Sequence, residues 1–362
     1  EQDNNLGKTP SFAHVSGNVY VMAYQGPSNR GYIKTFTLAD NGTITQIAGD
    51  EHDDAQGMYN SIVKVNGTVY ALAYSGSSNG GYIKTFNISN DGSEMEALGQ
   101  TIHQSNGTAY NSLVVADENT IVLTYQGPNY DGYIKTFTVS ANGADITQVS
   151  AVEHAGSQGR YNSLIKMDGD TYLLAFAGPG DDGVLKTFTI PNDGSSITAV
   201  TSLEHNTVNG IWNSVVQVDY NTYALAYHGY DTNDEYGLIQ TFTIPLDGST
   251  ITEVASQKFT TTATYGKYNS FIKLNSDEYA LAYQGDGEDG YVKTFTISAD
   301  GETITELWSL EHDQEKAYWN ELIQIDKNTF ALAYTDSYDD GWIKTFDIAS
   351  GDATGPSISY AT

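Results

Sequence analysis

The 362-residue sequence contains no cysteine and few basic residues, and both shortages exclude classes of function. Without cysteine there is no disulfide, no thiolate nucleophile and no cysteine-ligated metal. Sixteen Lys and Arg against 45 Asp and Glu give a formal net charge of −29. Nucleic acids and anionic membrane surfaces attract clustered cations, so we expect neither as a partner. No apolar run approaches the roughly 18 residues that a membrane-spanning helix needs, so we expect no membrane insertion.

The abundant residues, 27 Tyr and 36 Gly, belong to a repeat that fills the chain. The string Tyr-Ile-Lys-Thr-Phe and its variants occur seven times at intervals of 50 to 54 residues, at Tyr32–Phe36, Tyr82–Phe86, Tyr133–Phe137, Val184–Phe188, Leu238–Phe242, Tyr291–Phe295 and Trp342–Phe346. A second marker, an aromatic residue followed by Asn and Ser, begins at Tyr59, Tyr110, Tyr161, Trp212 and Tyr268. Its sixth copy is Trp319-Asn320-Glu321, and Thr9-Pro10-Ser11 is a degraded seventh. The chain is therefore one sevenfold array.

Each unit has the pattern of four short strands. In the second unit these are approximately Tyr59–Val65, Thr68–Ser75, Gly81–Ser89 and Glu94–His103, separated by Asn-Gly and Asp-Gly turns. The second strand alternates small residues (Val69, Ala71, Ala73) with large ones (Tyr70, Leu72, Tyr74). A sheet that is apolar on both faces must be covered on both sides, and sheets stacked radially around an axis achieve this.

The sequence thus predicts an all-β protein: one domain over residues 1–362, a seven-bladed β-propeller of four-stranded antiparallel sheets. The predicted blades are approximately 9–52, 59–103, 110–154, 161–205, 212–259, 268–312 and 319–362. Ser357–Thr362 is expected to supply the outer strand of the last blade.

Over essentially its full length the chain resembles the broad class of seven-bladed propeller repeat proteins. The Glu-His pair before the first strand of a unit, as at Glu51-His52, is similar to the Gly-His of WD repeats, although the Trp-Asp pair is missing. The resemblance implies the fold and not a function, because propellers host enzymes, lectins and scaffolds alike.

One face of the propeller is expected to carry the function. On this face lie the loops that join strand 2 to strand 3 within a unit and strand 4 to strand 1 of the next unit. They are longer than the turns on the opposite face, and binding residues concentrate in loops on a rigid scaffold. We call it the second face. Aromatic rings and Asn amides suit neutral sugars, through stacking and hydrogen bonding. The candidate ligand-binding residues are Tyr59, Asn60, Tyr110, Asn111, Tyr161, Asn162, Trp212, Asn213, Tyr268, Asn269, Trp319 and Asn320. The alternative is structural: the aromatic fills space between blades and Asn caps a turn.

Other polar residues on this face have simpler interpretations. The periodic histidines 52, 103, 154, 205 and 312 are each expected to tie the 4–1 loop to its blade by a hydrogen bond, since a metal would need them to converge. Asp181, Asp182, Asp339 and Asp340 are weak Ca²⁺ candidates, because carboxylates suit this ion but their spacing matches no dedicated calcium loop. Solvated acidic turns are the alternative, and we predict no other metal and no cofactor.

Departures from the repeat are where an enzyme would differ from a binding module, since catalysis needs different groups in different roles. The fifth unit has a 2–3 loop, from His228 to Gly237, that is three residues longer than its counterparts. If the protein is an enzyme, His228, Tyr230 and Arg160 are the candidate catalytic residues. Glu321 replaces the Ser of the repeat.

Three functions remain open from sequence. The favoured one is a secreted or cell-surface recognition module, lectin-like, that binds a neutral glycan or another surface ligand through several equivalent sites, with avidity from multivalency. The second is a polysaccharide-degrading enzyme, a lyase or hydrolase, centred on blade 5. The third is a structural component of an envelope or adhesin. High acidity and the absence of cysteine predict an extracellular or cell-surface location in a prokaryote, as a monomer or within a larger surface assembly.

Overall fold

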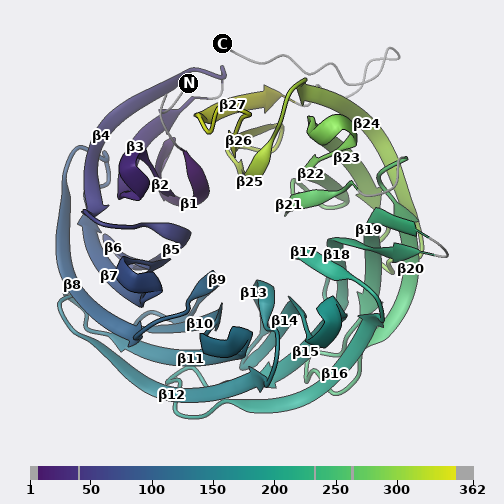
Figure 1. The fold of residues 1–362 in the computed structure, drawn as a ribbon, viewed down its shortest axis with the longest axis horizontal. Coiled ribbons are helices and arrows are strands. Elements are labelled where there is room, and N and C mark those ends of the chain that lie inside the picture. Colours follow the sequence, from purple (N-terminus) through teal and green to yellow (C-terminus); the bar gives the residue numbers. More distant parts are fainter. Residues whose placement is uncertain (1–6, 40, 232–233, 262–264, 348–362) are drawn as a thin grey trace.

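Seven antiparallel sheets stand radially around a central axis, as Figure 1 shows for the computed structural model. The structure describes residues 7–39, 41–231, 234–261 and 265–347. Within them, six sheets have four strands and the last has three, each in simple sequence order. The seven-bladed β-propeller predicted from the repeat is confirmed. The expected outer strand at Ser357–Thr362 lies outside the described residues.

The strands repeat in the same radial order in every blade. The innermost strands are β1 (Lys8–Ser16), β5 (Met58–Asn66), β9 (Ala109–Asp117), β13 (Arg160–Asp168), β17 (Gly210–Asp219), β21 (Lys267–Lys273) and β25 (Tyr318–Gln324). The second strands are β2 (Val19–Gln25), β6 (Val69–Ser75), β10 (Thr120–Gln126), β14 (Thr171–Ala177), β18 (Thr222–Asp231), β22 (Glu278–Gln284) and β26 (Thr329–Thr335). The third strands are β3 (Gly31–Leu38), β7 (Gly81–Ile88), β11 (Gly132–Val139), β15 (Gly183–Thr189), β19 (Asp234–Thr243), β23 (Gly290–Ile297) and β27 (Gly341–Asp347). The outer strands are β4 (Ile44–Asp53), β8 (Met95–Gln104), β12 (Ile146–Ala155), β16 (Thr198–Asn206), β20 (Thr252–Lys258) and β24 (Ile304–Asp313).

Five short 3₁₀ helices lie in the 2–3 loops of the second face. They are η1 (Pro27–Asn29), η2 (Ser77–Asn79), η3 (Pro128–Tyr130), η4 (Pro179–Asp181) and η5 (Asp286–Glu288). No helix in the described part of the chain has the length and apolarity that crossing a lipid bilayer requires.

The core lies between blades, and the small–large alternation of the second strand produces it. Tyr70, Leu72 and Tyr74 of β6 pack against the small residues Val21 and Ala23 of the preceding blade. On the opposite face, Ala71 and Ala73 make room for Ile121, Leu123 and Tyr125 of the following blade. Each large face therefore fills against a small one, and close packing of this kind holds neighbouring blades at a fixed spacing.

Hydrogen bonds from a repeated threonine also join the blades. In the Lys-Thr-Phe string the Thr hydroxyl donates to the Gly carbonyl in the 3–4 turn of the next blade, as in Thr35 to Gly92 (2.7 Å) and Thr136 to Gly194 (2.7 Å). The same contact closes the ring, because Thr345 of blade 7 donates to Gly42 of blade 1 at 3.0 Å. Phe12 and Tyr20 of blade 1 also share an apolar cluster with Ala331 and Ala333 of blade 7.

Candidate functional site

A β-bulge at the start of each innermost strand determines where the aromatic-Asn pair lies. In β5, Met58 pairs with Ser75 and Ser61 pairs with Ala73, so Tyr59 and Asn60 together oppose the single residue Tyr74. The aromatic residue of each copy has positive φ, from 52° to 58°, and Thr9 has φ 48°. Non-glycine residues in this left-handed region are strained and concentrate at functional sites. The bulge turns the aromatic side chain toward the axis.

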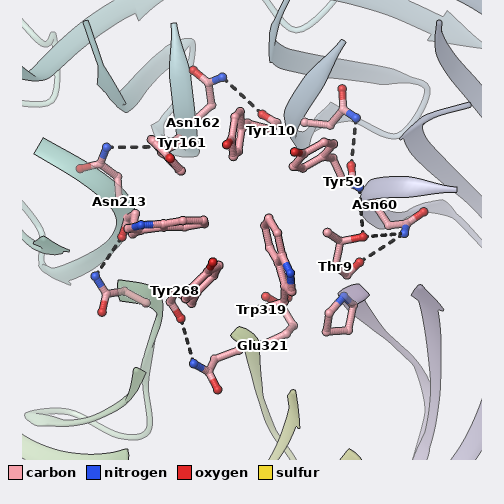
Figure 2. Close-up of a pocket in the computed structure, with 15 residues that line it drawn as sticks. Thr9, Tyr59, Asn60, Tyr110, Tyr161, Asn162, Asn213, Tyr268, Trp319 and Glu321 are labelled. Atoms are coloured by element: carbon pink, nitrogen blue, oxygen red, sulfur yellow. Dashed lines mark hydrogen bonds between the residues drawn. The ribbon is translucent and has the colours of Figure 1, made fainter. Parts of the chain in front are cut away.

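The six aromatic side chains form one continuous ring around the channel mouth on the second face (Figure 2). Neighbouring ring centroids are 4.8 Å apart for Tyr59–Tyr110, 4.4 Å for Tyr110–Tyr161 and for Tyr161–Trp212, 3.9 Å for Trp212–Tyr268, 5.1 Å for Tyr268–Trp319 and 5.8 Å for Tyr59–Trp319. Each of the six side chains is partly exposed. Sequence reasoning placed these residues at several equivalent sites, whereas the structure brings them together at one.

The Asn of the motif connects blades. Its amide nitrogen donates to the carbonyl of the aromatic residue in the preceding blade, as in Asn111 to Tyr59 (2.9 Å) and Asn320 to Tyr268 (3.1 Å). Asn60 bonds in the same way to Thr9. The Asn side chains line the pocket, but this donor is already used. A ligand contact from the Asn residues therefore stays a prediction.

The Ser of the motif makes a second link between blades. Its hydroxyl oxygen accepts the backbone N–H of the next blade, as from Leu113 to Ser61 (3.0 Å) and from Leu322 to Ser270 (2.9 Å). At the junction of blades 7 and 1 the carboxyl of Glu321 takes this role and accepts from the backbone N–H of Phe12. We call this junction the seam.

The pocket at the channel mouth encloses about 160 Å³ and is lined by the aromatic ring, the six Asn residues, Thr9, Pro10 and Glu321. Removal of the Glu321 carboxyl from water raises its pKa to about 8, although the bond from Phe12 favours the ionised form. Burial also raises the pKa of Tyr59, Tyr110 and Tyr268. These phenols stay neutral wherever Glu321 titrates, so the carboxyl is the group whose charge changes near neutral pH.

The periodic histidines occupy structural positions, but both ring nitrogens of His103, His154 and His312 are buried without a hydrogen-bond partner among the described residues, so the hydrogen bond expected from sequence is not formed there. Each histidine ring packs edge-on against an aromatic ring on the second strand of the following blade, as His52 does against Tyr74 with centroids 4.7 Å apart. Glycine makes the space, because a Cβ on Gly31 would lie 2.1 Å from the His52 ring. Burial lowers the pKa of His52, His103, His154 and His205 to about 3. The backbone carbonyls of His52, His103, His154 and His312 each accept a hydrogen bond from the lysine of the following blade, as from Lys84 to His52 at 2.8 Å.

The weak calcium candidates lie beside cations. Asp181 forms an ion pair with Arg160, and Asp339 forms one with Lys8 at 2.9 Å. Asp182 and Asp340 are the residues that follow them, in the same 2–3 loops. Among the described residues no group of three or more His, Asp or Glu side chains is arranged to hold a metal ion. The ion pairs of Asp181 and Asp339 are compatible with solvated acidic turns, and Ca²⁺ binding by the four residues stays a prediction.

Blade 5 differs from the sequence interpretation. The segment expected to be a long 2–3 loop continues the ladder of β18 and β19 as far as the Asp231–Asp234 pair, so His228 and Tyr230 lie in a strand. His228 is buried, with Nδ1 3.0 Å from the Tyr265 carbonyl oxygen and Nε2 3.3 Å from Glu235. Arg160 pairs with Asp181 in blade 4, and no described hydrogen bond or ion pair joins it to His228 or Tyr230. The structure does not bring the three residues into contact.

No family model matches this chain, and no curated protein does. Solved propeller structures resemble it. The periplasmic gluconolactonase of Pseudomonas aeruginosa superposes with a TM-score of 0.66 at 13% identity, covering 85% of this chain and 86% of that one. A putative 6-phosphogluconolactonase from Bacteroides fragilis gives 0.63 at 16% identity, with 84% of each chain covered. Sqt1 of Chaetomium thermophilum, bound to the N-terminus of ribosomal protein L10, gives 0.60 at 14% identity over 98% of this chain and 87% of that one. At such identities the likeness concerns the fold alone, and by its fold this protein is a seven-bladed β-propeller.

Proposed function

We propose that the protein is a recognition module that binds a neutral glycan, or another surface ligand, at the channel mouth of the second face. The observation that carries this proposal is the ring of six partly exposed aromatic side chains around one pocket. Apolar faces of sugars stack on aromatic rings, and the tyrosine hydroxyls and indole N–H groups supply polar contacts.

The size of the pocket restricts what enters it. About 160 Å³ corresponds to roughly five water molecules at 30 Å³ each. That is the space of a single sugar ring or a similar terminal group. We therefore expect recognition of a chain end or a small ligand, with the remainder of a longer ligand over the second face.

Convergence of the aromatics changes the expected binding mode. Separate sites on seven blades would give avidity within one molecule. A single ring of contacting side chains gives one site, so we expect one ligand per chain. A secreted or cell-surface role remains part of the proposal, supported by the net charge of −29 and the absence of cysteine.

Recognition fits the channel better than catalysis does. A catalytic centre needs groups in distinct acid, base and nucleophile roles. The described pocket lining has one carboxylate side chain, Glu321, and no Lys, Arg or His. The candidate catalytic residues of blade 5 are not assembled, as described above, so no observation favours the enzyme.

Calorimetric titration with a panel of neutral mono- and oligosaccharides tests the proposal. The expected result is binding with one site per chain, and at least tenfold weaker binding by Trp212→Ala, about 1.4 kcal/mol. Trp308→Ala is the matched control, because Trp308 lies on the outer strand β24 and is only partly buried. Equal loss in both variants, or no binding of any neutral saccharide at millimolar concentration, would refute it.

A further inference from the structure

Two departures from the sevenfold repeat lie side by side on the channel wall. Thr9 of blade 1 stands where six other blades have an aromatic residue, and Glu321 of blade 7 stands where the others have Ser. Both line the pocket, and Glu321 bonds to the backbone of Phe12 across the seam. The channel therefore has one side that is chemically unlike the rest.

Two aromatic side chains in edge-to-face contact border the seam. Trp319 of blade 7 and Tyr59 of blade 2 meet across the position where blade 1 lacks an aromatic, with centroids 5.8 Å apart at 79° (Figure 2). Trp212 is 5.5 Å from Trp319. The face of each ring carries negative electrostatic potential, which attracts cations most strongly for Trp.

Glu321 has capacity for a ligand. A carboxyl group has two oxygens, and one hydrogen bond from Phe12 leaves acceptor positions unused. The serines at the equivalent positions provide the same link between blades without a charge. A glutamate is therefore not needed to close the ring, and its charge needs another explanation.

Titratable side chains on the strands around β25 interact with groups other than Glu321. On β1, Lys8 pairs with Asp339, and His14 bonds to Gly17 at the far end of the strand. On β21, Lys273 donates to Val218, and Lys267 acts electrostatically on His228 and Glu288. On β26, Tyr334 donates to Asp313. Arg160, beside Tyr161, belongs to blade 4 on the opposite side of the channel and pairs with Asp181.

We infer that the seam side of the channel mouth binds an organic cation, an alkylammonium group, with Glu321 as counter-ion and the faces of Trp319 and Tyr59 as its walls. This inference rests on the proposed function, since it assigns a substrate class to part of the same pocket. A ligand that carries both a sugar-like face and an amine would use the whole ring.

The charge of Glu321 makes this recognition dependent on pH. Below pH 8 the carboxyl is increasingly protonated and neutral, and above pH 8 it is ionised. Burial raises the pKa of Tyr59, Tyr110 and Tyr268, so these phenols stay neutral in this range. Affinity for a permanent cation should therefore fall as the pH falls from 8 to 6, whereas affinity for a neutral ligand of the same shape should not.

Choline and its uncharged carbon isostere, 3,3-dimethyl-1-butanol, are suitable probes. Choline is positively charged and the isostere is neutral at both pH values, so any pH dependence of binding comes from the protein. Binding is measured by calorimetry and by tryptophan fluorescence at pH 8.5 and at pH 6. At pH 8.5 we expect choline to bind at least about tenfold more tightly than the isostere, a typical cation–π and ion-pair gain in a partly desolvated site. At pH 6 the difference should shrink to about threefold or less.

Glu321→Gln keeps an acceptor for Phe12 and removes the charge, so it should abolish the preference for choline at pH 8.5 and leave the isostere unaffected. Glu321→Ser restores the residue of the repeat and should behave in the same way. Glu302→Gln, an exposed change in a 3–4 turn, is the control. Equal binding of the two probes by the native protein, no choline binding at pH 8.5, or a preference that survives Glu321→Gln would each overturn the inference.

Neutral saccharide titration separates this inference from the proposed function. If saccharides bind in a way that depends on Trp212 while choline shows no preference, the inference is wrong and the proposed function stands. If choline binding depends on Glu321 while no neutral saccharide binds, the seam is a cation site and the glycan proposal fails.

Discussion

The interior of the blades and the wall of the channel are built from the same repeat. Departures from the repeat preserve side-chain shape in the interior, whereas on the channel wall they change the chemistry. In the interior, even an exception preserves shape: Phe259 replaces the periodic histidine and packs on Tyr283 with centroids 4.8 Å apart, as His52 packs on Tyr74 at 4.7 Å. On the channel wall, Thr9 removes an aromatic ring and Glu321 adds an acid. Substitutions in the core thus maintain packing, whereas those at the seam create one chemically distinct side.

Glu321 also lowers stability. Its pKa in the folded chain is raised from 4.5 to about 8, so the folded protein holds a proton that the unfolded chain releases at neutral pH. Groups that destabilise a fold are commonly found where binding or catalysis requires them. The comparison of blade interior with seam therefore separates residues that serve the fold from the residue for which we propose a role in ligand binding.

The largest expected effect comes from truncating the blade interior. Tyr74→Ala should lower the free energy of unfolding by about 3–5 kcal/mol, because its buried ring leaves a cavity between two blades. Tyr110→Ala, in the partly exposed ring, should lose less than half as much. Urea unfolding measures both, and equal losses would mean that the aromatic ring is part of the core.

Removal of the seam carboxyl should have the opposite sign. Glu321→Gln should stabilise the protein by on the order of 3 kcal/mol at pH 8.5 and by little at pH 4. The raised pKa of Glu321 makes the native protein lose stability as the pH rises from 4.5 to 8, and Gln does not titrate. Unfolding at the two pH values gives the difference. A gain of the same size at both would show that charge is not its cause.

The buried histidines should make the protein sensitive to acid. Burial lowers the pKa of His52, His103, His154 and His205 from 6.5 to about 3, so the stability that depends on their neutral rings is present above pH 6.5 and is lost as the pH falls toward 3. His103→Phe copies the natural Phe259 and should reduce the loss between pH 6.5 and 4.5 by about 2 kcal/mol. The reverse change, Phe259→His, should increase it. An unchanged pH profile in either variant would contradict the packing described for this position.

The smallest effect concerns the links between blades. Thr136→Val removes the hydrogen bond to Gly194 and the one that Thr136 accepts from Ser150, and should cost about 1–2 kcal/mol. Thr250→Val, on an exposed turn, should cost almost nothing. Thermal unfolding compares the two variants. Indistinguishable midpoints would show that the threonine hydrogen bonds do not contribute to holding the blades together.

The sequence was sufficient for the fold because its signals are local and repeated. The period, the turn residues and the alternation from Val69 to Tyr74 each depend on neighbouring residues, and all were confirmed. The ring was not predictable in the same way. It depends on a bulge with positive φ at Tyr59 and its counterparts, a conformation that aromatic residues rarely adopt, and on rotation of seven units about one axis.

Residue type identified the candidate site better than it identified roles. The aromatic-Asn motif was selected correctly as a group on one face, but its Asn bonds to the preceding blade, a partner about 50 residues away. The sequence showed that Glu321 departs from the repeat but not where its side chain lies. Its contact with Phe12 forms only when blade 7 closes the ring against blade 1. In blade 5, His228 and Tyr230 were placed in a loop because their segment matches the 2–3 loops of the other units, whereas the three additional residues allow the chain to extend the hairpin.

A crystal structure of the protein with choline bound at pH 8.5 tests the central claim most directly. The account predicts electron density for the ammonium group at the seam, within contact distance of the Glu321 carboxyl and over the faces of Trp319 and Tyr59. Density only on the outer rim or at blade 5, or an empty channel mouth at a saturating choline concentration, would contradict it.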